Sequence, residues 1–336
     1  MLRCNSWIWR PGRHLPSRWP TSLRSSRAAS SPAVKSASCR RWGGGWSRVP
    51  EFFADAEAAF DDARFVIWGY PFDGTACFRK GTADGPEAIR FHSHNFESWL
   101  NELGLDLRDI PAHDWGDVEA VADQAANNSA IEEIVGRIGA AGKFPVGLGG
   151  EHSLTPPAVA ALKRHYPELG VVILDAHLDY RDGYQGAKWS HAATTRRVSE
   201  IVGPERVRSL GIRSLSREEL HAAREDGLHY VETGWTELRE HLSDLVEALD
   251  GPLYLSLDMD VIDPAFAPGV GTPEPFGMTP YEVLQVLNFL SDRLVGFDCV
   301  ETCPPADNGN TAALAARLVR HTIGAVAKAQ PRDGAD

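Results

Sequence analysis

Short apolar runs alternate with amphipathic segments from Glu51 to about residue 330. The apolar runs span four to six residues and are bounded by glycine, proline or charged residues, a pattern typical of buried strands. This pattern predicts strands at residues 65–68, 144–148, 171–174, 206–211, 228–231, 253–257 and 295–299. Helical periodicity between them predicts helices at residues 85–100, 129–141, 156–166, 217–226, 235–249, 280–293 and 311–329.

Strands that alternate with helices in this way form a parallel sheet with helices packed on both faces. We therefore predict an α/β fold of three αβα layers around a central, mostly parallel β-sheet. No internal repeat or linker interrupts residues 51–330, which we expect to form one domain. In such sheets, ligands bind at the carboxyl ends of the strands, so polar clusters directly after strands are the first candidates for a site.

Bulk composition limits the class of protein. A length of 336 residues with 43% hydrophobic content is enough for a large core. No stretch approaches the roughly 18 apolar residues of a membrane-spanning helix, so we expect no membrane partner. Five scattered cysteines predict a reducing compartment rather than a disulfide framework, and hence a cytoplasmic location.

Charge divides the chain at about residue 50. Residues 1–50 contain ten basic residues and no acidic ones, whereas the remainder contains 24 basic and 46 acidic residues, a net charge of −22. Such an acidic body argues against nucleic-acid binding. We expect residues 1–50 to be a basic, disordered extension, with a transit peptide or a functional basic tail as the alternatives. Residues 331–336 form a short tail.

Three polar clusters directly follow predicted strands: GLGGEHS at 147–153, DAHLD at 175–179 and SLDMDVIDP at 256–264. In an extended chain, residues i, i+2 and i+4 point the same way, so the side chains within a cluster can converge. Each cluster alone is more often a turn, a helix cap or a hydrogen-bonded core residue. Together they predict one site formed by His152, Asp175, His177, Asp179, Asp258 and Asp260.

Four carboxylates in one crevice would repel each other strongly in a low dielectric, and several would have to take up protons. Two divalent metal ions would balance the four negative charges. A set of two imidazoles and four carboxylates suits Mn²⁺ better than structural Zn²⁺, which favours thiolates, or Ca²⁺, which favours oxygen ligands alone. We therefore predict two Mn²⁺ ions per subunit.

The motifs GGEHS, DAHLD and SLDMDVIDPAFAPGVGTPEP resemble the three signature blocks of the arginase/agmatinase family of ureohydrolases, in order and at similar separation. PFDGTACFRKGTADGPEAIR at 71–90 and DCVETCPPAD at 298–307 extend the resemblance over residues 51–330. It implies an arginase-like fold and a homotrimer or homohexamer. The resemblance assigns one Mn²⁺ to His152, Asp175, Asp179 and Asp258, and the other to His177, Asp175, Asp258 and Asp260.

In this family, water adds to the guanidinium carbon and the tetrahedral adduct collapses to urea and an amine. The resemblance implies that Glu301 steers the guanidinium, that Asp179 relays a proton to the leaving amine, and that His191 is a proton shuttle. Three positions depart from the common pattern, because Ala192, Phe276 and Glu151 stand where many members have glycine, glycine and aspartate. These departures make the loop geometry around His191 harder to predict.

The loop YRDGYQGAKWSHA at 180–192 resembles agmatinases more than arginases. We therefore expect hydrolysis of agmatine to putrescine and urea, with Asp182 or another loop acid receiving the ammonium. Arg181 keeps open a substrate with a carboxylate, such as arginine or 4-guanidinobutanoate, and aminopropylagmatine is a further alternative. A non-catalytic oligomeric relative would be expected to lack at least one metal ligand, and all six are present.

Overall fold

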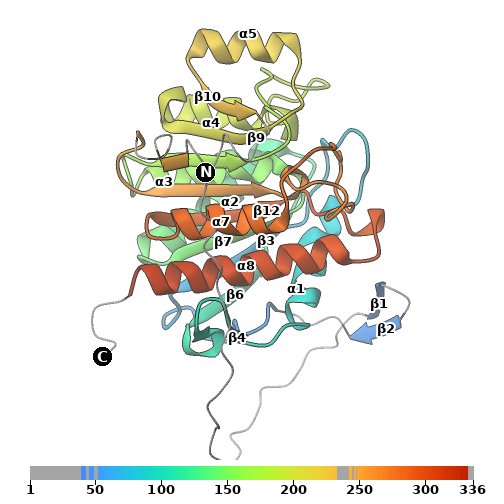
Figure 1. Cartoon of the computed structure of the whole chain (residues 1–336), viewed down its shortest axis with the longest axis vertical. Coiled ribbons are helices and arrows are strands. Elements are labelled where there is room, and N and C mark those ends of the chain that lie inside the picture. Colours follow the sequence, from blue (N-terminus) through green and yellow to red (C-terminus); the bar gives the residue numbers. More distant parts are fainter. Residues whose placement is uncertain are drawn as a thin grey trace, which may run out of the picture. The chain divides into compact units, whose positions relative to one another are not determined.

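The protein forms an eight-stranded, fully parallel β-sheet with helices on both faces, as a computed structural model of the chain shows (Figure 1). The structure describes residues 39–42, 45–48, 52–232, 242–243, 246 and 248–331. Neighbouring strands follow the order β10-β9-β8-β11-β12-β7-β3-β6. The predicted three-layer αβα architecture is therefore confirmed.

The strands of this sheet are short and mostly buried along their whole length, as expected for strands covered on both faces. They are β3 (Phe65–Tyr70), β6 (Ala112–Asp117), β7 (Phe144–Gly149), β8 (Gly170–Leu174), β9 (Val207–Ile212), β10 (His229–Glu232), β11 (Leu253–Asp258) and β12 (Leu294–Val300). Two antiparallel pairs lie outside the sheet, namely β1 (Cys39–Trp42) with β2 (Gly45–Arg48), and β4 (Trp99–Leu100) with β5 (Leu105–Asp106).

Two hydrophobic clusters, one on each face of the sheet, join the helices to the strands. The first cluster involves α1 (Gly85–Ser93), α7 (Pro280–Leu290) and α8 (Asn310–Ala329). The second involves α2 (Gln124–Ala140), α3 (Thr155–Lys163), α4 (Thr194–Val202) and α5 (Arg217–Asp226). Successive residues of a strand enter opposite clusters, as Ile67 and Trp68 do in β3.

Strand register brings the four central strands to a common edge. In β11, Leu257 pairs with Leu174 of β8 and with Cys299 of β12, and Cys299 in turn pairs with Leu148 of β7. The loops that follow these four strands therefore begin side by side. This register explains why clusters far apart in the sequence can form one site.

All seven predicted strands are present, with bounds that differ by one or two residues. The helix expected at 85–100 ends at Ser93, and the helix expected at 235–249 lies mostly outside the described residues. The edge strand β6 and helix α4 were not predicted, and neither were the short strands β1, β2, β4 and β5. Strand β6 lacks an apolar pattern because it carries Asp114 and Asp117. Both side chains bind Arg90 of α1, at 2.8 Å and 2.5 Å.

The predicted extension at residues 1–50 lies outside the described residues except for β1 and β2, which pair with each other. Across the part of the chain that the structure does describe, no helix is both long and apolar enough to cross a bilayer.

Candidate metal centre

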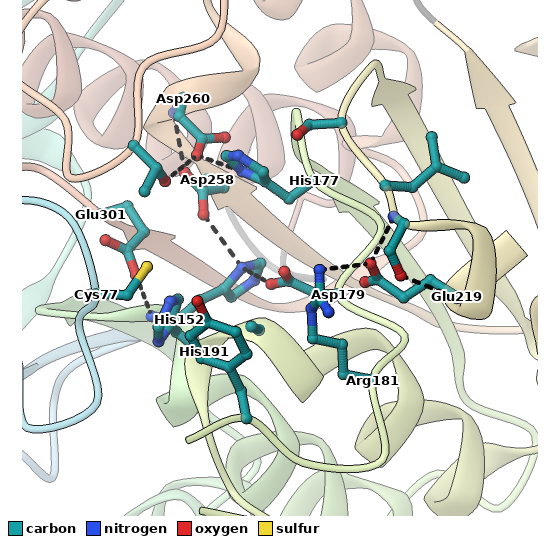
Figure 2. Close-up of a pocket in the computed structure, with 16 residues that line it drawn as sticks. Cys77, His152, His177, Asp179, Arg181, His191, Glu219, Asp258, Asp260 and Glu301 are labelled. Atoms are coloured by element: carbon teal, nitrogen blue, oxygen red, sulfur yellow. Dashed lines mark hydrogen bonds and ion pairs between the residues drawn. The ribbon is translucent and has the colours of Figure 1, made fainter.

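The six predicted metal ligands lie together at the carboxyl ends of strands β7, β8 and β11 (Figure 2). His152 begins a 3₁₀ turn three residues after the end of β7, and Asp175 directly follows β8. Asp258 is the last residue of β11, and Asp260 lies in the 3₁₀ turn Met259–Val261. The structure thus brings together all six residues that the strand-end clusters predicted.

His152 is the centre of one half of this cluster. Its Nδ1 lies 3.2 Å from Asp175 Oδ2, 3.2 Å from Asp258 Oδ2 and 3.6 Å from Asp179 Oδ2. All four side chains are buried. One imidazole nitrogen that faces three carboxylate oxygens forms a ligand set for a divalent cation.

His177 is the centre of the other half. Its Nδ1 lies 2.9 Å from Asp260 Oδ2 and 3.6 Å from Asp175 Oδ1. Asp175 therefore contributes one oxygen to each half, which is the arrangement of a ligand that bridges two ions.

Two buried atoms in this cluster have no hydrogen-bond partner among the described residues, His152 Nδ1 and Asp175 Oδ2. An unpaired buried polar atom is costly, so such atoms indicate a missing partner. The donor set is two imidazoles and four carboxylates, which fits two divalent cations of the Mn²⁺ type. The residues present therefore fit a binuclear metal centre.

Electrostatics in the cluster point the same way. Burial and the neighbouring charges of Asp260 and Asp175 raise the pKa of Asp258 well above its usual range, and burial with Asp175 does the same for the pKa of Asp179. Burial lowers the pKa of His152, but the carboxylates of Asp175 and Asp258 outweigh burial and raise it. The cluster holds protons when no cation balances its charge, so metal binding must release protons.

A chain of hydrogen bonds behind the cluster fixes the orientation of His152. Ser256 Oγ donates to the buried carboxylate of Asp298 at 2.6 Å, so its lone pairs must accept from His152 Nε2–H at 2.9 Å. Tyr254 and Thr155 also donate to Asp298, at 2.6 Å and 3.0 Å. With one proton fixed on Nε2, Nδ1 is the nitrogen that faces the carboxylates, and it can give up its proton to bind a cation.

Glu301 directly follows β12, and its side chain contacts the backbone of His152. Its Oε1 accepts a hydrogen bond from His152 N at 2.8 Å, and its side chain is buried. Burial, with the nearby charge of Glu151, raises the pKa of Glu301 to about 8. A carboxylate in this setting gains strongly from a cationic partner, as expected of a residue that receives a guanidinium.

His191 is held by Thr75 and Glu151. Thr75 Oγ1 donates its proton to Glu151 Oε1 at 2.7 Å, so it must accept from the backbone N–H of His191 at 3.1 Å and from His191 Nδ1–H at 3.0 Å. His191 Nε2 then carries the lone pair. Burial, with the positive charges of His152 and His177, lowers the pKa of His191 to about 4, so the ring is a neutral proton acceptor.

A cavity of about 290 Å³ joins these groups. It is lined by residues of the metal centre together with His191 and Glu301, and also by Arg181, Tyr184 and Glu219. Asp182 does not line it. The Asp182 side chain is 78% exposed and lies 3.1 Å from Arg197 of α4, so the structure does not bring it to the other predicted site residues.

Several contacts of the site were not predicted from the sequence. Ser256 and Asp298 are polar residues inside otherwise apolar strands, a pattern that indicates a buried hydrogen-bond network. The role of Thr75 gives no local signal, because it depends on contacts with Glu151 and His191 that are 76 and 116 residues away. Asp263 fixes the loop after Asp260 by accepting hydrogen bonds from Ala265 N and Gly277 N.

Comparisons with known proteins agree with this geometry. The model of the arginase family matches residues 63–324. An agmatinase from Bacillus anthracis is 36% identical over 277 residues, which cover 81% of this chain and 94% of that protein. An N(1)-aminopropylagmatine ureohydrolase from Thermococcus kodakarensis is 38% identical, with 80% and 92% covered. The crystal structure of an agmatine ureohydrolase from Thermoplasma volcanium superposes with a TM-score of 0.78 at 38% identity, with 83% and 95% covered. The chain therefore belongs to the arginase family, as an agmatinase-like ureohydrolase.

Proposed function

We propose that this protein uses two Mn²⁺ ions to hydrolyse agmatine, with putrescine and urea as products. The observation that carries the proposal is the convergence of six metal-ligating side chains, with Asp175 shared between the two halves. The similarity to proteins described as agmatinase and agmatine ureohydrolase supports agmatine as the guanidino compound.

Each half of the centre would hold one ion. His152, Asp175, Asp179 and Asp258 would hold the first, and His177, Asp175, Asp258 and Asp260 the second. When bound, such ions supply an activated water at neutral pH and stabilise negative charge in the transition state. The protein residues then have to place the guanidinium and move two protons.

Glu301 would bind the planar guanidinium, because its buried carboxylate lines the cavity next to His152. Asp179 lies 3.6 Å from His152 on the cavity wall and would carry a proton towards the leaving amine. His191, a neutral acceptor through Nε2, would exchange protons between the cavity and solvent.

A second candidate is the hydrolysis of an aminopropylated agmatine. The relative from Thermococcus kodakarensis carries that activity in its name and is 38% identical to this chain. A homotrimer or homohexamer and a cytoplasmic location stay predictions from the sequence.

The test is a urea assay on Mn²⁺-loaded protein with agmatine, aminopropylagmatine, arginine and 4-guanidinobutanoate side by side. We expect agmatine to have the highest kcat/KM. Asp258→Asn should abolish turnover because it removes a shared metal ligand, whereas Asp292→Asn, at an exposed acid outside the cavity, should retain it. Absence of urea from all four compounds would refute the proposal.

A further inference from the structure

The cavity has a charged end opposite Glu301. Figure 2 shows Glu301 on one side of the metal-ligating residues and the pair Arg181 and Glu219 on the other. Among the described residues that line the cavity, Glu219 is the one carboxylate besides Glu301 that lies outside the metal cluster. A guanidino substrate that spans the cavity would therefore place its tail near Arg181 and Glu219.

Glu219 is a fixed group. It lies in the first turn of α5, where it forms a capping box with Ser216 and accepts a hydrogen bond from Ser216 N at 2.8 Å. Its other oxygen accepts from Tyr180 N at 3.1 Å, and its side chain is only 5% exposed. These contacts hold the carboxylate in one position, so it is preorganised for a cationic partner.

Arg181 is the cation that currently meets this carboxylate. Its Nη2 lies 3.1 Å from Glu219 Oε2, and its guanidinium lies over the ring of Tyr184 at 5.3 Å. In contrast to Glu219, the Arg181 side chain is 38% exposed. A long, partly exposed side chain can turn into solvent at small cost, whereas Glu219 cannot leave its place.

This asymmetry decides which tail the pair accepts. If Arg181 turns away, a buried carboxylate loses its partner, and an ammonium in the same place restores the balance. If a carboxylate tail bound Arg181 instead, it would bring a second anion close to Glu219, because Arg181 and Glu219 are only 3.1 Å apart.

We infer that Glu219 is the receptor for the cationic tail of an ω-guanidinoalkylamine, and that Arg181 occupies the place of this ammonium until the substrate displaces it. The inference rests on the proposed function, since it assigns the second end of the same cavity. It makes the pair a specificity determinant that favours amine tails over neutral and carboxylate tails.

The test compares three substrates of Mn²⁺-loaded protein that differ only in the tail: agmatine, n-butylguanidine and 4-guanidinobutanoate. Glu219→Gln removes the negative charge but retains a side chain that can still form the capping box. We expect it to lower the ratio of kcat/KM for agmatine to that for n-butylguanidine by roughly 10- to 100-fold, the worth of a hydrogen bond to a charged group. Calorimetric titration with putrescine should show a similar loss of affinity.

Arg181→Ala should act in the opposite direction. Without the competing guanidinium, we expect the KM for agmatine to fall by about two- to fivefold, the scale of a partly exposed ion pair. Glu218→Gln and Arg217→Ala are matched controls, because both side chains are exposed on the same helical turn and do not line the cavity. They should leave the ratio and the KM unchanged.

The outcomes separate the two proposals. Absence of urea from every guanidine refutes the proposed function and this inference together. If agmatine is hydrolysed but Glu219→Gln lowers activity on all three substrates equally, only the inference fails. Selective loss of 4-guanidinobutanoate turnover in Arg181→Ala, with agmatine unaffected by Glu219→Gln, would show instead that the pair receives a carboxylate and would also overturn it.

Discussion

Replacing Ser256 with alanine would remove a single oxygen that connects the metal centre to the core. Ser256 is fully buried in β11, donates to Asp298 and accepts from His152 Nε2–H. Without this oxygen, the Nε2–H of a buried imidazole has no acceptor, and the ring is free to rotate or to change tautomer. Rotation moves Nδ1 away from the carboxylates, and the other tautomer places the proton on Nδ1, so either change removes the lone pair that a cation would bind.

The magnitude follows from the two contacts. Loss of a hydrogen bond to a charged group costs about 1.5 to 3 kcal/mol, and an unpaired buried donor costs about 1 to 3 kcal/mol. Asp298 keeps its hydrogen bonds from Tyr254 and Thr155, so the fold should survive. We expect metal-free Ser256→Ala to lose about 3 to 5 kcal/mol of unfolding free energy. Mn²⁺ affinity at the His152 half should fall by roughly 10- to 100-fold, as is usual for partners that orient a metal ligand.

Calorimetric titration with Mn²⁺ and denaturant unfolding of the metal-free protein would measure both effects. Ser209→Ala is the matched control, because Ser209 is equally buried in β9 but its Oγ has no hydrogen-bond partner among the described residues. This control should bind Mn²⁺ normally. If Ser256→Ala binds two ions with unchanged affinity, the orientation of His152 does not depend on Ser256 and the reasoning is wrong.

Four further predictions test other parts of the structure. Thr75→Val should lower kcat by about tenfold or more and alter its pH profile, whereas Thr75→Ser should restore both, because only a hydroxyl can orient His191. Glu301→Gln should lower kcat/KM for agmatine by about tenfold or more while Mn²⁺ titration is unchanged. Removal of metal by a chelator should abolish urea release, and Mn²⁺ should restore it. Burial lowers the pKa of His321 below its usual 6.5. As the pH falls, His321 therefore takes up its proton in the unfolded chain before it does so in the folded protein. The unfolding free energy is thus retained above about pH 6.5 and decreases below it. Denaturant unfolding at pH 7.5 and pH 5.5 should show a smaller decrease for His321→Gln than for the unmodified protein.

The convergence of the six candidate metal ligands was predictable because their chemistry is local to strand ends. In a parallel sheet, an apolar run predicts where a strand ends, and alternation predicts which side chains converge, so the clusters at 152, 175–179 and 258–260 could be combined without a structure. The same reasoning explains what was missed. Strand β6 satisfies its aspartates through Arg90, and α4 buries Arg197 against Asp182 and Glu200, so neither element has the apolar pattern that its position would suggest.

Asp182 lies away from the cavity for a related reason. Spacing placed it three residues after Asp179, near enough to line the same cavity. The chain turns at this point, however, and Arg197 of α4 binds both the carbonyl oxygen and the carboxylate of Asp182, at 3.0 Å and 3.1 Å. Glu219, 40 residues after Asp179, lines the cavity instead. Which acid faces a cavity depends on tertiary contacts, and the sequence does not report them.

An unusual backbone conformation also helps to position two of the acids in the site. Asp179 and Glu301 have φ values of 50° and 61°, in the left-handed region that normally favours glycine, at a cost of roughly 1 to 2 kcal/mol per residue. Glycine would remove this strain but also the carboxylate. Flanking hydrogen bonds hold both turns in place: Asp179 O accepts from Arg196 N at 3.2 Å, and Glu301 N donates to Gly150 O at 2.8 Å. The strained turns bring one carboxylate to His152 Nδ1 and the other to His152 N. Of the five described non-glycine residues with positive φ, two are therefore the acids proposed to contact the metal centre and the substrate, where backbone strain that places a functional group can persist.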